Sequence, residues 1–269
     1  MLKYIQGNTA QYARGIASAD TFLSNTIYLC ETGDCNMLNF IGRGAAFNPA
    51  EGNNSAYFRS GSQLLLIDCG ENVFTRMVTG RILDGITEVT IVISHLHSDH
   101  CGSLGTFVHY CKYALGCTPT IALPADPEYR EQVTTLLTLF AAPSDCYHLI
   151  SDSDVTDFAG VRSIRYIPTF HAPMLKCYSF SIETADGLIF YSADTATEKT
   201  LCDFIHDHPD VKEIYIDTND STAPDSVHLN VDKLFAALSP EYRAITYMMH
   251  IPSVKCAEKG LALGFKIVQ

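Results

Sequence analysis

The segment Ser94–His100 concentrates side chains of the types that bind metals. It holds three histidines and one aspartate within six residues, namely His95, His97, Asp99 and His100. Imidazole nitrogens and carboxylate oxygens are preferred ligands of zinc and similar divalent cations. The apolar run Val89–Ile93 predicts a buried strand just before the segment, and α/β proteins usually carry their chemistry on loops at strand ends. We therefore interpret the segment as part of a metal site rather than as a solvated turn.

A site for two cations needs further ligands, including a carboxylate that both cations share. Three candidates follow apolar runs further along the chain: His171, Asp194 and His250. A lone histidine after a strand is more often structural or solvated than a ligand. Their order along the chain and their positions after predicted strands favour a role together with the first cluster.

The pattern of apolar residues predicts the elements that position these side chains. Strands are expected at residues 161–167, 177–183, 188–192, 213–217 and 244–249, and helices at 102–115, from 126 onward, at 197–208 and at 230–238. Asp126, Thr197 and Asn230 are expected to cap three of these helices. We see no internal repeat and no interdomain linker.

The run H-x-H-x-D-H resembles the metallo-β-lactamase superfamily of metal-dependent hydrolases, and the resemblance extends from about Met37 onward. Residues 191–195 (Y-S-A-D-T) are similar to the superfamily motif Y-S-G-D-T, with Ala193 where glycine is usual. The resemblance implies an α/β (α+β) fold, a four-layer αβ/βα metallo-β-lactamase sandwich, for residues 37–269. Residues 1–36 are interpreted as an N-terminal extension in which a hairpin could form.

The resemblance also divides the ligands between two divalent metal ions. Zinc is expected, with manganese or iron as alternatives, because mixed nitrogen and oxygen ligation suits all three. Asp68, in the motif I-D-C-G-E, is expected to support the metal loop from behind. The first ion is expected to take His95, His97, His171 and Asp194, and the second Asp99, His100, Asp194 and His250.

Further motifs favour one branch of the superfamily. G-R-G-x-A-F, G-N-N-S-A-Y and the closing M-H resemble phosphodiesterases and ribonuclease Z, and within this branch the anti-Pycsar proteins of phages and their bacterial relatives. That resemblance implies a homodimer that hydrolyses cyclic mononucleotides such as cyclic CMP and cyclic UMP with a metal-activated water. It also implies that His228 contacts the phosphate or protonates the leaving group. A capping or surface role is the alternative for His228, and Asp99 is the second catalytic candidate.

Three other activities are alternatives. Ribonuclease Z itself carries a long tRNA-gripping arm, for which the 23 residues from His171 to Asp194 leave no room. A cyclic sugar-phosphate phosphodiesterase would bring a cysteine-rich zinc site, and Cys30 with Cys35 is weak evidence for one. A lactonase or thioesterase could use the same metals on a carbonyl.

The bulk composition limits the partners. The net charge of −12 and the absence of a basic run argue against a polymeric nucleic acid and leave a small anionic phosphodiester as the expected substrate. No apolar stretch approaches the roughly 18 residues of a membrane span, and a cytoplasmic protein without membrane contact is expected. The ten scattered cysteines are expected to be reduced.

Overall fold

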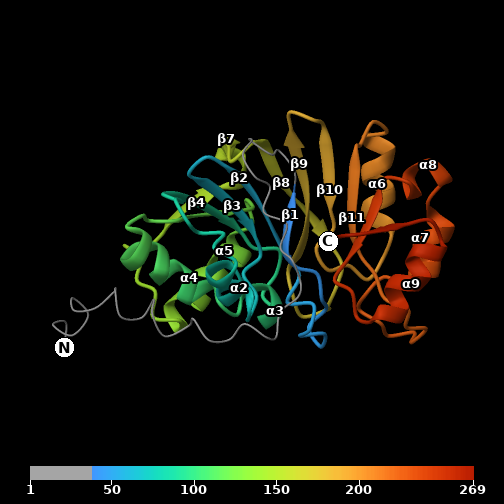
Figure 1. Cartoon of the computed structure of the whole chain (residues 1–269), viewed down its shortest axis with the longest axis horizontal. Helices are drawn as coiled ribbons and strands as arrows, with labels where there is room; N and C mark the ends of the chain where they lie inside the picture. Colours follow the sequence, from blue (N-terminus) through green and yellow to red (C-terminus); the bar gives the residue numbers. More distant parts are fainter. Residues whose placement is uncertain (1–37) are drawn as a thin grey trace. The chain divides into compact units, whose positions relative to one another are not determined.

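The computed structural model describes residues 38–269, whose strands form two mixed sheets (Figure 1). The predicted N-terminal hairpin and the pair Cys30 and Cys35 lie outside the described residues. The first sheet has the order β1 (Asn39–Gly42), β2 (Ser55–Ser60), β3 (Gln63–Ile67), β4 (Glu88–Val92), β5 (Thr120–Leu123) and β6 (His148–Ser151). The second has the order β7 (Thr156–Phe158), β8 (Val161–Thr169), β9 (Cys177–Thr184), β10 (Leu188–Tyr191), β11 (Glu213–Asp217), β12 (Thr246–Met249) and β13 (Lys266–Ile267).

Strand direction brings the ends of several strands to one edge of each sheet. Strands β3 to β6 are parallel to one another. In the second sheet β10 to β13 are parallel, and β8 runs in the same direction because β9 is antiparallel to both β8 and β10. The loops that follow β8, β10, β11 and β12 therefore leave the second sheet at the same edge.

Helices cover the outer face of each sheet (Figure 1). The first sheet packs against α2 (Val73–Thr79), α4 (Leu104–Tyr110) and α5 (Pro127–Leu139), and the second against α6 (Lys199–Asp207), α7 (Val231–Ala237) and α9 (Val254–Ala262). Two short helices, α3 (Ser98–Cys101) and α8 (Pro240–Arg243), and a π-helical turn, Cys111–Leu115, complete the described helices, apart from a 3-10 turn at Asp152–Asp154. The predicted four-layer αβ/βα sandwich is confirmed.

Strand β3 shows why the sequence folds into these layers. Its residues 64–67 are all apolar and all fully buried. Leu64 and Leu66 pack with the helices, whereas Leu65 and Ile67 pack in the core between the sheets. Successive strand residues point to opposite faces, so an unbroken apolar run marks a strand that is covered on both sides.

Two of the three predicted helix caps are confirmed and one is wrong. Asp126 accepts hydrogen bonds from the main chain at the start of α5, and Asn230 does the same for α7. Thr197 does not cap α6, which begins two residues later, at Lys199. The Thr195 hydroxyl donates to the Thr197 carbonyl oxygen at 3.0 Å and so holds Thr197 in the preceding turn.

Gly70 allows the turn after β3 to contact the segment Ser94–His100. A Cβ atom added at Gly70 would lie 1.9 Å from the main-chain oxygen of Asp99. We expect Gly70→Ala to displace that segment and to lower the free energy of unfolding by about 3 kcal/mol, measured by urea denaturation. Gly61→Asn is the control, because that open position has a φ of +55°, which asparagine tolerates. Equal losses in both variants would contradict the steric explanation.

Within residues 38–269, no helix is long and apolar enough to cross a lipid bilayer. The eight cysteines of this part of the chain are free thiols, as expected from their scattered positions.

Candidate metal centre

The tertiary structure brings all seven predicted ligands together. The four candidates between His95 and His100 lie after β4 and at the start of α3. The other three each follow a strand of the second sheet: His171 follows β8, Asp194 follows β10 and His250 follows β12. Six of the seven are buried, and only His97 is partly exposed. Parallel strand ends therefore position these side chains, as expected for α/β folds.

A first group is formed by His95, His97, His171 and Asp194. The Nδ1 atom of His97 lies 3.0 Å from His95 Nε2 and 3.2 Å from His171 Nε2. Asp194 Oδ2 lies 3.8 Å and 3.6 Å from the same two Nε2 atoms. Tetrahedral ligands about 2.1 Å from an ion are separated by about 3.4 Å, so these spacings fit one cation.

A second group is formed by Asp99, His100, Asp194 and His250. His100 Nε2 lies 3.2 Å from Asp194 Oδ1 and 3.4 Å from Asp99 Oδ2. His250 Nε2 lies 3.3 Å from Asp99 Oδ2 and 3.5 Å from Asp194 Oδ2. Asp194 thus belongs to both groups, in the position expected of a shared carboxylate.

Asp68 holds the histidines of the first segment in one orientation. Its carboxylate accepts hydrogen bonds from the Ser94 amide at 2.7 Å, from the Ser94 hydroxyl at 2.8 Å and from His100 Nδ1 at 2.8 Å. His95 Nδ1 lies 3.0 Å from the same hydroxyl, which donates its hydrogen bond to Asp68 and therefore accepts one from the ring. Since both rings donate through Nδ1, their Nε2 atoms face the centre. The expected supporting role of Asp68 agrees with this geometry.

Asp217, at the end of β11, is a site residue that the sequence analysis missed. Its carboxylate accepts hydrogen bonds from His228 Nδ1 at 2.7 Å and from the Thr195 amide at 3.1 Å. Its other oxygen lies 3.3 Å from His250 Nδ1. The available signal is an aspartate directly after an apolar run, because Asp217 follows Ile214–Ile216 as Asp68 follows Leu64–Ile67.

Asp217 is placed to orient histidines rather than to bind a third cation. Asp194, Asp217, His228 and His250 form a third group with metal-compatible side chains. However, the 2.7 Å between His228 and Asp217 is a hydrogen-bond length and is shorter than the spacing of ligands around an ion. Asp217 therefore fixes the Nδ1 side of the His228 ring by a hydrogen bond, and its other oxygen lies beside His250 Nδ1 as a neighbouring negative charge.

The two groups differ in the charge that they favour on their histidines. Burial lowers the pKa of His95, His97 and His171, and the neighbouring imidazoles lower it further. Burial would also lower the pKa of His100 and His250, but nearby carboxylates outweigh it and raise the pKa of His250 to about 10. The first group therefore offers neutral nitrogens, whereas the second attracts positive charge.

The carboxylate of Asp194 remains ionised. Burial acts to raise the pKa of Asp194, but His100 and His250 outweigh it and hold the pKa well below its usual range. Among the buried side-chain atoms of residues 38–269, His100 Nε2 and Asp194 Oδ1 are without a hydrogen-bond partner. Such atoms are rare in folded proteins. Divalent cations fit this donor set in chemistry and in spacing.

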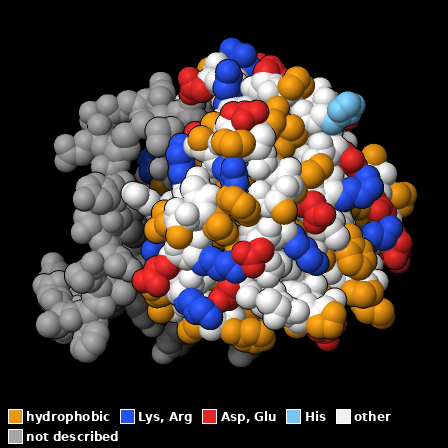
Figure 2. All heavy atoms as spheres, turned by 90° about the vertical axis from the view of Figure 1, so that its right-hand side faces the viewer, with side chains coloured by type: hydrophobic (Ala, Val, Ile, Leu, Met, Phe, Trp, Pro, Cys, Tyr) orange, Lys and Arg blue, Asp and Glu red, His pale blue; other side chains and the backbone are white. Residues whose placement is uncertain are grey.

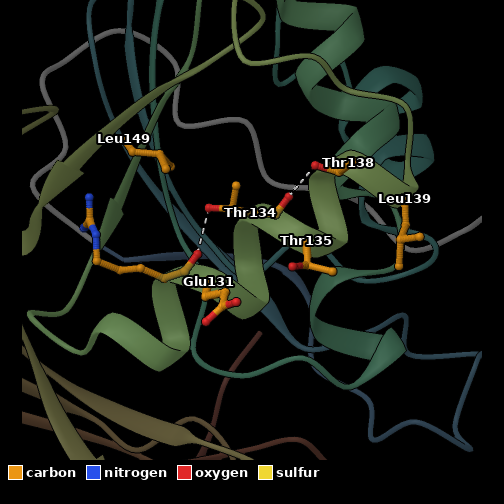
Figure 3. Close-up of a pocket in the computed structure, with 7 residues that line it drawn as sticks. Glu131, Thr134, Thr135, Thr138, Leu139 and Leu149 are labelled. Atoms are coloured by element: carbon orange, nitrogen blue, oxygen red, sulfur yellow. Dashed lines mark hydrogen bonds between the residues drawn. The ribbon is translucent and has the colours of Figure 1, made fainter.

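A surface hollow lies beside α5 (Figure 3), and none of these donors lines it. It is lined mainly by α5 residues, together with Leu149 of β6. The hydroxyls of Thr134 and Thr138 donate to main-chain oxygens one turn earlier in the helix. These hydroxyls are already used, so we assign no chemistry to the hollow.

The family model described as "Anti-Pycsar protein Apyc1" matches residues 36–259. The chain belongs to this family. The anti-Pycsar protein Apyc1 of Saccharibacillus brassicae is 27% identical over 221 residues, which is 79% of this chain and 88% of the relative. A ribonuclease Z of Mycolicibacterium paratuberculosis is 29% identical over 178 residues, which is 59% of this chain and 62% of the relative.

Solved structures agree on the fold. The metallo-β-lactamase fold protein YhfI of Bacillus subtilis superposes with a TM-score of 0.65 at 21% identity, covering 86% of this chain and 94% of YhfI. Together with family membership, this confirms the prediction of a metallo-β-lactamase-fold hydrolase related to the anti-Pycsar proteins.

Proposed function

We propose that the protein is a dinuclear metal-dependent phosphodiesterase that hydrolyses cyclic mononucleotides, with cyclic CMP and cyclic UMP as the first candidates. The observation that carries this proposal is the pair of ligand groups that share Asp194 and have His228 beside them. Family membership supports the choice of substrate. The proposed metals are zinc, or manganese or iron, because each accepts mixed nitrogen and oxygen ligands.

When bound, two divalent cations would lower the pKa of a water molecule and neutralise charge on the phosphoryl group. The protein's own residues would set the geometry. Asp99 serves the second group as a carboxylate, since burial acts to raise its pKa but His100 and His250 hold that pKa below its usual range. We propose that this carboxylate also orients the nucleophilic water.

His228 is the proposed general acid. Its ring centroid lies 4.9 Å from the rings of both His171 and His250, one from each ligand group. Burial acts to lower the pKa of His228, but the Asp217 carboxylate outweighs it and raises that pKa. Because Nδ1 of His228 donates a hydrogen bond to Asp217, the proton available to the leaving ester oxygen is on Nε2. Donation there would accompany cleavage of the phosphorus–oxygen bond and open the cyclic phosphate.

Replacing His228 by glutamine should reveal a role in leaving-group protonation. We expect kcat for cyclic CMP to fall about 100-fold or more, because the ribose oxygen leaves poorly without a proton. Bis(p-nitrophenyl) phosphate has a good leaving group and should lose less than about 5-fold. The exposed His206 provides the control variant His206→Gln. Equal losses on both substrates, at unchanged metal content, would argue against the acid role.

A ribonuclease Z-like activity is the main alternative because of the relative described above. Against it stand the short interval between His171 and Asp194 and the net charge of −12. On the face around α6 to α9, basic and acidic side chains are interspersed (Figure 2), whereas a polymer backbone is bound by clustered basic residues.

The proposed function is tested with a substrate panel. The metal-loaded protein is incubated with cyclic nucleotides, bis(p-nitrophenyl) phosphate, a cyclic sugar phosphate, a tRNA precursor and a lactone. We expect hydrolysis of the cyclic nucleotides at the highest kcat/KM. Turnover of the lactone alone would indicate carbonyl chemistry, and preference for the tRNA precursor would indicate the nuclease.

We also propose, from family membership, that the protein is a homodimer. Light scattering coupled to gel filtration tests this directly. A mass near 30 kDa at working concentrations, close to the 29.6 kDa of one chain, would contradict it.

A further inference from the structure

We propose that Asn219 is a positioning residue that holds His228 and the main-chain carbonyl of Val227 in their working places. This inference rests on the proposed function, because it concerns the leaving-group acid and a ligand of the first group. Asn219 precedes a loop, residues 220–229, of which only Val227 and His228 take part in the proposed mechanism.

The loop is closed at its base by main-chain pairing. Asn219 donates its amide to the Leu229 carbonyl at 2.9 Å, and the Val231 amide donates to the Asn219 carbonyl at 2.9 Å. Residues 221–225 at the tip are exposed, whereas Ser226, Val227 and His228 are half-buried. We call these three residues the inner arm.

The Asn219 side chain braces the inner arm and is only 9% exposed. Its Nδ2 donates to the Ser226 hydroxyl at 2.9 Å and to the His228 carbonyl oxygen at 3.2 Å. Its Oδ1 accepts from the Ser221 amide at 3.0 Å. The Ser226 hydroxyl in turn donates to the His228 carbonyl oxygen at 2.9 Å. One amide thus joins both sides of the loop.

Consecutive residues of the inner arm act on different parts of the centre. The Val227 carbonyl accepts a hydrogen bond from His171 Nδ1 at 2.7 Å and so directs His171 Nε2 into the first group. The next residue, His228, is the proposed acid. Loops are more mobile than the elements they connect, and catalytic groups must be held to about 0.5 Å. Asn219 supplies that constraint for the Val227 carbonyl and for His228.

If Asn219 only stabilised the loop, loosening the loop elsewhere would have the same effect. Asn230 allows this comparison. Asn230 stands at the same loop base and caps α7 through Asp232 and Lys233. Its Nδ2 donates to the Ser221 carbonyl at 2.7 Å, on the outer side of the loop. Asn230→Ser keeps a capping oxygen and loosens the outer side. It is therefore the matched control for loop stability.

The experiment compares Asn219→Ala, Ser226→Ala and Asn230→Ser in the full chain at saturating metal. For Asn219→Ala we expect kcat for cyclic CMP to fall about 10- to 50-fold, with KM within about 2-fold and less than about 3-fold loss on bis(p-nitrophenyl) phosphate. Zinc titration of the metal-free protein should show about 3- to 10-fold weaker binding. Ser226→Ala should show the same selective loss on cyclic CMP at smaller size, which keeps the test valid if Asn219→Ala fails to fold. Asn230→Ser should match the wild type.

Equal losses on the two substrates, or the same changes in Asn230→Ser, would overturn the positioning role. So would Asn219→Ala and Ser226→Ala variants that keep wild-type kinetics and zinc affinity. Failure of the proposed function looks different, since the wild type would then hydrolyse neither phosphodiester. In that case unchanged zinc affinity in Asn219→Ala would still overturn the part of the inference that concerns Val227 and His171.

Discussion

Replacing Asp194 by asparagine is expected to remove metal binding from both ligand groups and to lower phosphodiester hydrolysis by about 1000-fold or more. Asp194 contributes an oxygen to each group, at 3.2 Å from His100 Nε2 and 3.6 Å from His171 Nε2. An amide keeps the shape of the side chain but removes the negative charge that two cations would share. Metal content by mass spectrometry and kcat/KM for cyclic CMP are the measurements.

The control for this variant comes from the other end of the same strand. Asp186 lies in the exposed turn between β9 and β10, and Asp186→Asn makes the same chemical change away from the centre. It should retain full metal content and activity. An Asp194→Asn protein with wild-type metal content would show that the shared carboxylate is assigned wrongly.

Asp68→Asn is expected to have the second largest effect, through orientation rather than ligation. Asp68 accepts three hydrogen bonds, from the Ser94 amide, the Ser94 hydroxyl and His100 Nδ1. An amide group would turn an NH2 toward at least one of these donors and leave it without an acceptor. We expect metal affinity to fall about 10- to 100-fold and the free energy of unfolding to fall by about 2 kcal/mol.

Calorimetric titration and urea denaturation of the metal-free protein measure these two effects separately. Asp84→Asn serves as the control because Asp84 is an exposed residue paired with Arg81. A folded Asp68→Asn protein with unchanged metal affinity would show that the hydrogen bonds of Asp68 do not govern the orientation of His100.

Some of the residues in these predictions can be identified from the sequence, and others cannot. The cluster from His95 to His100 is local, and its density of imidazoles predicts metal binding without knowledge of the fold. His171, Asp194 and His250 could be named because each follows an apolar strand and because the motifs resemble a known superfamily. In the structure these three side chains lie beside the cluster of residues 95–100, and their role as ligands stays a prediction.

Asp217 carries a weaker signal in the sequence, and Asn219 carries none. Asp217 is one of several acids after apolar runs, and its importance depends on two rings that approach it from other segments. Asn219 is an ordinary loop residue in sequence. Its side chain becomes specific only when β11 and α7 bring residues 219 and 230 together, because hydrogen bonds across a loop depend on how the loop closes.

The class of chemistry, the alternation of strands and helices, and seven candidate metal ligands could all be predicted from short stretches of the chain. Side-chain type and apolar periodicity are local properties, so they can be read from neighbouring residues alone. The folded chain was needed to show that Asp194 lies in both groups, that His100 Nδ1 contacts Asp68, and that Asp217 is the carboxylate that orients His228. These features depend on angles and distances between strands that lie far apart in the chain, and packing of the two sheets settles them.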